Sequence, residues 1–153
     1  MSRLEFLLCL TVVAVLIALL LPRLAELGGA TRAARLQAAA AQVRAAANVF
    51  HAKCEALRSA DGSADCAHIS LDGLPVAGVN GWPEPSPTGI ARAASLTLGG
   101  DARTVGFIAQ PRVRDGTPAL ALRLLRPDCE FLYVQAKSPD ASPEVDIVDA
   151  SCH

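Results

Sequence analysis

An uncharged apolar segment near the N-terminus constrains this chain more than any other feature. It runs from Phe6 to Leu21, with an acid, Glu5, directly before it and a proline, Pro22, directly after it. A helix over this segment is roughly 24 Å long, a little short of the ~20 residues that usually cross a membrane. We therefore expect a helical anchor that completes its span with Leu4 or with residues after Pro22.

A cleaved secretory signal peptide is the alternative interpretation of this segment, because such a peptide also has a short apolar core and a basic start. Glu5 weakens the positive start that a signal peptide needs, and no clear Ala-x-Ala cleavage site follows closely. The residues therefore favour an anchor that stays on the chain.

Helix-weakening residues follow the apolar segment. Pro22 removes a helix hydrogen bond and clashes with the preceding turn, and Gly28 and Gly29 weaken the helix again. We predict a hinge from Pro22 to Gly29. Residues 1–30 are then an apolar anchor and assembly half-helix with its hinge, and residues 31–153 form a single globular head.

The head begins with a pattern that predicts an amphipathic half-helix ending near Arg58. Apolar residues recur there at steps of three and four, which places them on one helix face. They are Leu36, Ala40, Val43, Ala47, Phe50, Cys54 and Leu57. The abundant alanine of this segment suits close helix packing.

Residues 61–100 show no sustained period and are rich in glycine, proline and serine, which predicts a long ordered loop. Within it we expect a short strand near 69–71, a helical turn over 88–94, and Trp82 as a plug that fixes the loop to the core.

Four short runs after residue 100 have the character of strands bounded by proline, glycine or aspartate. They are 104–109, 119–125, 130–136 and 144–148. Their near-regular spacing predicts a four-stranded antiparallel meander over 101–153, and the helix stripe is the available cover for its apolar face. The predicted fold class is therefore α+β, with a long N-terminal helix packed on a four-stranded sheet.

Five cysteines divide unevenly along the chain, with Cys9 inside the apolar segment and four in the head. If the head lies outside the cytoplasm, those four are expected to form two disulfides. Three pairings are open, and we favour Cys54 with Cys66 and Cys129 with Cys152.

No pattern in the chain indicates catalysis or a cofactor. The sequence has no phosphate-binding glycine loop, no His-Glu-x-x-His and no Cys-x-x-Cys, and its three histidines and head cysteines match no zinc spacing. Fourteen basic against fifteen acidic residues leave a formal net charge of −1, which gives no electrostatic reason to bind nucleic acid. We expect a protein that is not an enzyme and that holds no metal.

Glu5, the uncharged run and Pro22 together resemble the mature N-terminus of type IV pilins and of type II secretion pseudopilins, at the family's own spacing when Met1 counts as the first mature residue. The expected helix, loop, four-stranded sheet and C-terminal cysteine pair agree with that architecture. The segments 80–83 and 88–90 are also similar to a loop of pilins of the mannose-sensitive haemagglutinin type.

The resemblance implies a precursor cut by a prepilin peptidase that methylates the new N-terminus, Met1. In the filament core, the Met1 amine and the Glu5 carboxylate of neighbouring subunits would neutralise each other, and Pro22, Gly28 and Gly29 would mark where the helix loosens during assembly. The implied location is a single pass of the inner membrane before assembly and an extracellular pilus afterwards. One departure is Ala14, where many family members have glycine.

The function implied by this resemblance is that of a structural subunit of a type IV pilus-like helical filament of identical chains, built by the pilus assembly machinery. Such fibres serve adhesion, motility, DNA uptake or secretion. Two alternatives stay open. One is a pseudopilin of a type II secretion system, and the other is a solitary membrane-anchored extracytoplasmic binding domain in which Trp82 and its loop hold a ligand.

Overall fold

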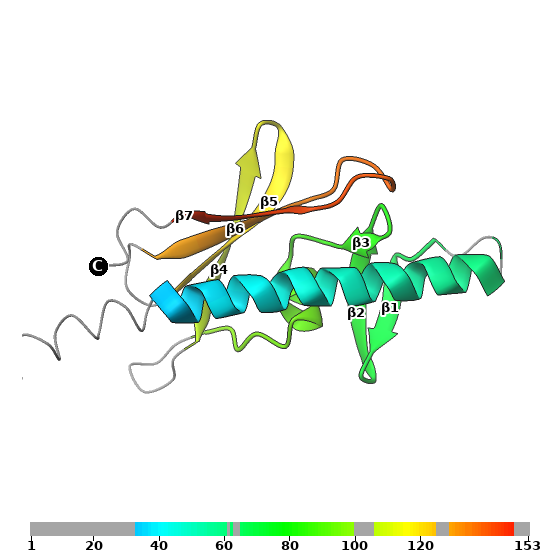
Figure 1. Ribbon diagram of the computed structural model, residues 1–153, viewed down its shortest axis with the longest axis horizontal. Helices are drawn as coiled ribbons and strands as arrows, with labels where there is room; N and C mark the ends of the chain where they lie inside the picture. Colours follow the sequence, from blue (N-terminus) through cyan, green and yellow to red (C-terminus); the bar gives the residue numbers. More distant parts are fainter. Residues whose placement is uncertain (1–32, 61, 63–64, 100–105, 125–128, 149–153) are drawn as a thin grey trace, which may run out of the picture.

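One long helix and two antiparallel sheets form the described part of the chain. The computed structural model describes residues 33–60, 62, 65–99, 106–124 and 129–148, and residues 33–60 are helical. Figure 1 shows this helix lying along the molecule in front of both sheets. Every structural statement below concerns these residues.

The helix buries the stripe that its sequence predicts, with one exception at its end. Leu36, Val43, Phe50 and Cys54 are each fully buried, whereas Leu57 is 41% exposed. The helix closes at Gly62, whose backbone N–H donates to Arg58 O at 2.8 Å. The φ of Gly62 is +63°. This is the left-handed conformation that commonly ends a helix and that glycine adopts at little cost.

The larger sheet is the predicted meander. Its strands are β4 (Phe107–Arg114), β5 (Thr117–Leu124), β6 (Glu130–Val134) and β7 (Glu144–Val148), and they pair in the order β4-β5-β6-β7. Alternate residues of β5, Leu120 and Leu122, join the first half of the helix in one buried cluster, as expected when one face of a sheet meets the core.

A second sheet occupies the region for which the sequence predicts a loop. It consists of β1 (His68–Leu71), β2 (Leu74–Val79) and β3 (Trp82–Pro83) in the order β1-β2-β3. Two-residue turns at Asp72-Gly73 and Asn80-Gly81, all at positive φ, join the strands as hairpins. A short helical turn, η1 (Pro87–Ala91), follows and overlaps the helical turn predicted over 88–94.

The same helix covers both sheets, because its stripe is divided between two buried clusters. Residues from Leu36 to Ala47 pack with the four-stranded sheet. Phe50 and Cys54 pack instead with Ile69 and Val76 of the smaller sheet.

The predicted fold class has to be corrected in two respects. The chain is α+β, but its described residues hold two antiparallel sheets rather than one, because two tight glycine turns fold the predicted loop into hairpins. The long helix at 33–60 is amphipathic rather than apolar, with charged residues such as Arg35 and Lys53 on its exposed side. The predicted boundary at residue 30 lies outside the described residues.

The predicted localisation, a single pass of the inner membrane followed by an extracellular pilus, is also corrected. In the part of the chain that the structure describes, no helix is both long enough and apolar enough to cross a membrane. The segment on which that prediction depends, residues 1–22, lies outside this part.

Tyr133 connects the two sheets through its side chain. It is fully buried on β6, and its hydroxyl donates to Pro83 O of β3 at 2.9 Å. Burial disfavours the phenolate and raises the pKa of Tyr133 above its usual value. The neutral hydroxyl is therefore the form that the fold requires.

We predict that this tyrosine makes the fold sensitive to alkali. Below pH ~10 the folded and unfolded chains both keep the proton. Above that pH only the unfolded chain loses it, so the free energy of unfolding falls by about 1.4 kcal/mol per pH unit. Urea unfolding from pH 8 to 11 measures this slope, and Tyr133→Phe should remove that contribution while costing about 1 to 3 kcal/mol at pH 7 through the unpaired Pro83 carbonyl.

Tyr133 is the only tyrosine of the chain, so phenolate absorbance reports on it alone. The expected absorbance change coincides with unfolding. Ionisation at pH ~10 in a chain that is still folded would contradict the prediction.

Candidate functional site

The residues predicted to direct assembly are not among those that the structure describes. Met1, Glu5, Pro22, Gly28 and Gly29 all precede residue 33. Their roles in processing, charge neutralisation and hinge motion stay predictions. The described residues that bear on function belong to the helix and to the segments packed against its C-terminal half.

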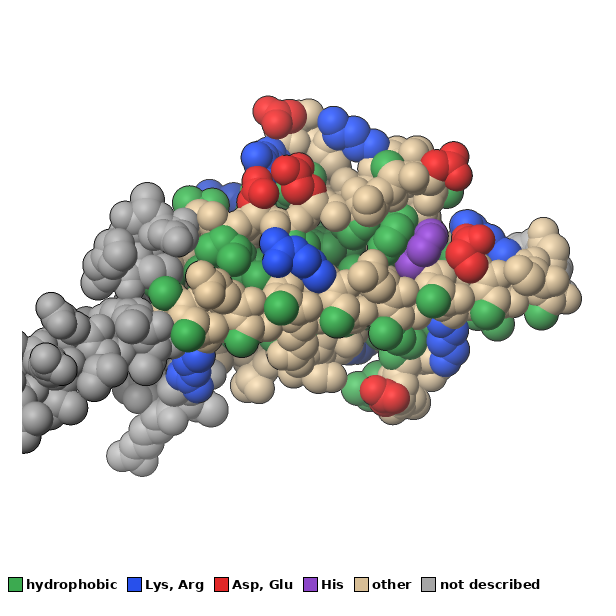
Figure 2. Space-filling model, in the orientation of Figure 1, with side chains coloured by type: hydrophobic (Ala, Val, Ile, Leu, Met, Phe, Trp, Pro, Cys, Tyr) green, Lys and Arg blue, Asp and Glu red, His purple; other side chains and the backbone are tan. Residues whose placement is uncertain are grey.

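The outward face of the helix is a band of small apolar side chains, which we call the alanine face. Its members follow one another at steps of three and four and lie directly opposite the core stripe. They are Ala34, Ala38, Ala41, Ala45, Val49, Ala52 and Ala56, all exposed, with Val49 exposed to 58%. Figure 2 shows hydrophobic side chains at intervals along the front of the helix, with basic side chains above and below them.

Basic side chains beside the alanine face are directed toward the sheets. Arg44 donates to Val145 O of β7 at 2.7 Å, and Lys53 donates to Ser70 O of β1 at 2.6 Å. These hydrogen bonds fix the helix to each sheet by a side chain on its flank. They also leave the alanine face without a charged member.

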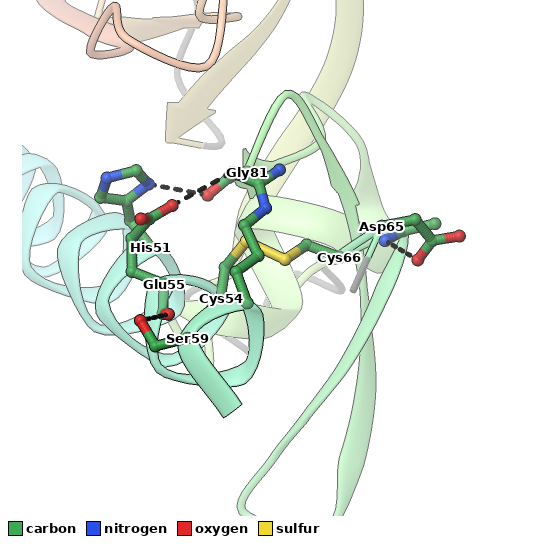
Figure 3. Close-up of a disulfide and its surroundings, with 9 residues drawn as sticks. His51, Cys54, Glu55, Ser59, Asp65, Cys66 and Gly81 are labelled. Carbon is green, nitrogen blue, oxygen red and sulfur yellow. Dashed lines mark hydrogen bonds and ion pairs between the residues drawn. A yellow bond between two sulfur atoms is a disulfide. The ribbon is translucent and has the colours of Figure 1, made fainter. Parts of the chain in front are cut away.

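The Cys54–Cys66 disulfide is confirmed. It joins the last third of the helix to the residues before β1, with Cα atoms 5.6 Å apart and a sequence separation of 12. Figure 3 shows the bond beside the turn of helix that carries His51, Glu55 and Ser59. Cys129 is disulfide-bonded as well, and Cys152, its predicted partner, lies outside the described residues.

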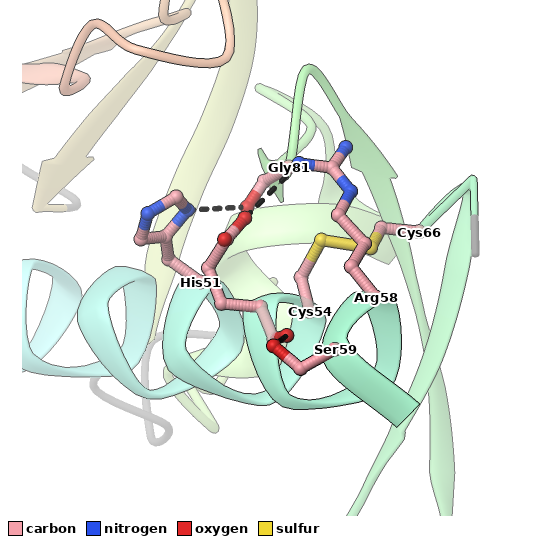
Figure 4. Close-up of polar contacts among 7 residues, drawn as sticks. His51, Cys54, Arg58, Ser59, Cys66 and Gly81 are labelled. Atoms are coloured by element: carbon pink, nitrogen blue, oxygen red, sulfur yellow. Dashed lines mark hydrogen bonds and ion pairs between the residues drawn. A yellow bond between two sulfur atoms is a disulfide. The ribbon is translucent and has the colours of Figure 1, made fainter. Parts of the chain in front are cut away.

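A stacked pair of rings lies one turn before the disulfide. The His51 and Trp82 ring centroids are 3.9 Å apart and the planes differ by 2°. His51 Nδ1 lies 3.0 Å from Gly81 O, as Figure 4 shows. A carbonyl only accepts, so Nδ1 donates to it.

Trp82 fixes its segment to the core, as the sequence predicts. It is 7% exposed and belongs to the larger buried cluster. Sequence reasoning missed its pairing with His51. The available signal was the Asn80-Gly81 turn, which reverses the chain just before Trp82 and lets it return to the helix.

No family profile, curated protein or solved structure matches this chain. The resemblance to pilins and pseudopilins therefore depends on the N-terminal residues quoted above. The alanine face and the ring pair are the structural observations from which function can be argued.

We predict that the Cys54–Cys66 bond supplies a large part of the stability of the head. Closing a loop of this length stabilises a fold by about 3 kcal/mol in the chain-entropy account. Cys54→Ala, Cys66→Ala and the double variant should each lose about that much in urea unfolding. The losses should not add, because each single change already removes the bond.

Thiol titration of the non-reduced chain provides the control. The single variants should each show one thiol more than the double variant. Single variants that unfold at the wild-type urea concentration would show that the bond does not constrain the head.

Proposed function

We propose that this chain is a structural subunit of a filament of the type IV pilin and pseudopilin kind, which polymerises through its N-terminal half-helix. The observation that carries the proposal is the alanine face. It is exposed, apolar and uncharged, and it follows the predicted assembly segment, residues 1–30, in the sequence.

The chemistry of the alanine face suits a neighbouring helix. Small side chains let two helix backbones approach closely, and interaxial distances of about 8 Å need such residues. A helix face that stays in water usually carries charged and polar residues instead. The flanking Arg44 and Lys53 side chains bind backbone carbonyls of the sheets, so they do not obstruct that approach.

Glu5 supports the same proposal from the sequence side. A carboxylate at the start of an apolar run is costly when it is buried without a partner. In a filament, the N-terminal amine of the next subunit would supply that partner. Pro22 and the two glycines that follow would let each subunit adjust the angle between its apolar half-helix and its head.

A pseudopilin subunit would differ from a pilin subunit only in the length of the assembly that it forms. It would use the same helix faces and form short structures. Electron microscopy of the isolated assembly separates the two, since a true pilin gives long fibres.

We predict that Ala45→Glu prevents filament formation while the head stays folded. A carboxylate there would be buried without a partner against the neighbouring subunit, which costs several kcal/mol, so the filament yield should fall at least about tenfold. Val113→Glu, at a position 74% exposed on β4 and away from the helix, is the matched control and should assemble normally. Glu5→Ala should also abolish filaments.

The measurement is the amount of filament recovered by sedimentation from cells that make each variant, with urea unfolding of the purified chain as the folding control. Wild-type yields from both Ala45→Glu and Glu5→Ala would refute the proposal.

A further inference from the structure

A cleft of about 570 Å³ lies between the C-terminal half of the helix and the loop that joins β6 to β7. Asn48, His51, Glu55 and Arg58 line it from the helix, Trp82 from β3, and Asp140 and Ser142 from the loop. We propose that this cleft binds a neutral saccharide of one or two rings. This goes beyond the filament function and does not depend on it.

The ring pair supplies a flat platform of the kind on which the C–H face of a sugar packs. Stacking on Trp82 covers one face of the His51 ring, and His51 is only partly buried, which leaves its other face for the cleft. The hydrogen bond to Gly81 O holds the ring plane in place. A platform that is already fixed loses little conformational entropy when a ligand packs on it.

The cleft contains both hydrogen-bond donors and acceptors, which is the combination that hydroxyl groups of a ligand need. Each sugar hydroxyl both donates and accepts. The Asn48 amide and the Ser142 hydroxyl also do both, while the carboxylate of Asp140 accepts. These polar groups surround the aromatic platform that the His51 ring provides.

Trp82 is the buried member of the ring pair. It is 7% exposed, and its indole Nε1 is buried without a hydrogen-bond partner among the described residues. Buried N–H groups in folded proteins are nearly always paired, because leaving one unpaired costs free energy. Packing and the stack with His51 therefore hold the indole in the wall of the cleft.

The charges in the cleft argue against an anion as its ligand, and the arrangement of its side chains argues against a metal ion. An anion would meet the carboxylates of Glu55 and Asp140, and the Arg58 guanidinium is already paired with Glu55 at 3.0 Å. For a metal ion, the described residues contain no group of three or more histidine, cysteine or acidic side chains placed to hold one. A neutral polyol satisfies the donors and acceptors without adding an unpaired charge.

The cleft can be tested through its own tryptophan, because Trp82 is the only tryptophan of the chain. The full-length chain is titrated in sugar-free buffer with glucose, galactose, mannose, N-acetylglucosamine and lactose, and Trp82 emission is recorded. At least one sugar should give a saturable change with a Kd on the order of 1 mM. The single indole N–H signal in a nitrogen-15 correlation spectrum should shift in the same titration.

Two variants and one control locate the binding. Asp140→Asn and Ser142→Ala should each raise the Kd at least fivefold. Asp72→Asn, which changes another acid at the distant β1–β2 turn, should leave it unchanged. Urea unfolding of all three checks that the fold is retained.

Three outcomes would overturn the proposal. They are the absence of a saturable change with any sugar up to 100 mM, an equal effect of Asp140→Asn and Asp72→Asn, and saturation by inorganic phosphate instead of sugars. None of these depends on whether the chain forms filaments, because the titration uses the unassembled protein. A failure of the filament proposal would likewise leave this result unchanged.

Discussion

Burial of one helix stripe by two different sheets is the interaction on which the rest of the structure depends. The first half of the stripe, from Leu36 to Ala47, fills the space above the four-stranded sheet, and Phe50 with Cys54 fills the space above the three-stranded sheet. A fully buried leucine, valine or phenylalanine contributes about 1.5 to 3 kcal/mol. The two sheets and their adjoining turns also contact each other directly. Tyr133 donates to Pro83 O, Asn80 donates to Ala136 O, and Trp82 of β3 belongs to the larger buried cluster.

The side of the helix that faces away from both sheets is the alanine face. The residues that face outward have no role in the core, yet small apolar residues occupy the centre of that side. Charged side chains on the flanks reach back to Val145 O and Ser70 O instead of covering it. A helix whose only task was to cover two sheets would gain solubility from charges there. We therefore propose that a neighbouring subunit covers the alanine face.

The helix and the four-stranded meander could be predicted because their signals are periodic and local. Leu36 to Cys54 repeat at helical steps, and the strands after residue 106 are short apolar runs between clear turns. The disulfide at Cys54 and Cys66 followed from cysteine spacing and an assumed oxidising location. Leu57, which continues the same period, is exposed because the helix extends beyond the sheets at that end.

The second sheet and the cleft could not be predicted in the same way. Strand β1 is only four residues long and β2 contains Pro75 and Gly78, so no period of two emerges. The Asp72-Gly73 and Asn80-Gly81 pairs are nevertheless typical of hairpin turns. The ring pair joins His51 on the helix to Trp82 on β3, and Asp140 reaches the cleft from a third segment. These residues meet only through tertiary packing, and the Asn80-Gly81 turn is the one local signal that bears on their meeting.

One face of the helix holds the head together, and we propose that the opposite face contacts the next subunit. Electron cryo-microscopy of a filament isolated from cells that make this chain tests it most directly. We expect a fibre in which the head retains both sheets and the alanine face, from Ala34 to Ala56, is buried against a neighbouring helix. A fibre in which that face remains in solvent, or a preparation that contains only single chains, would contradict it.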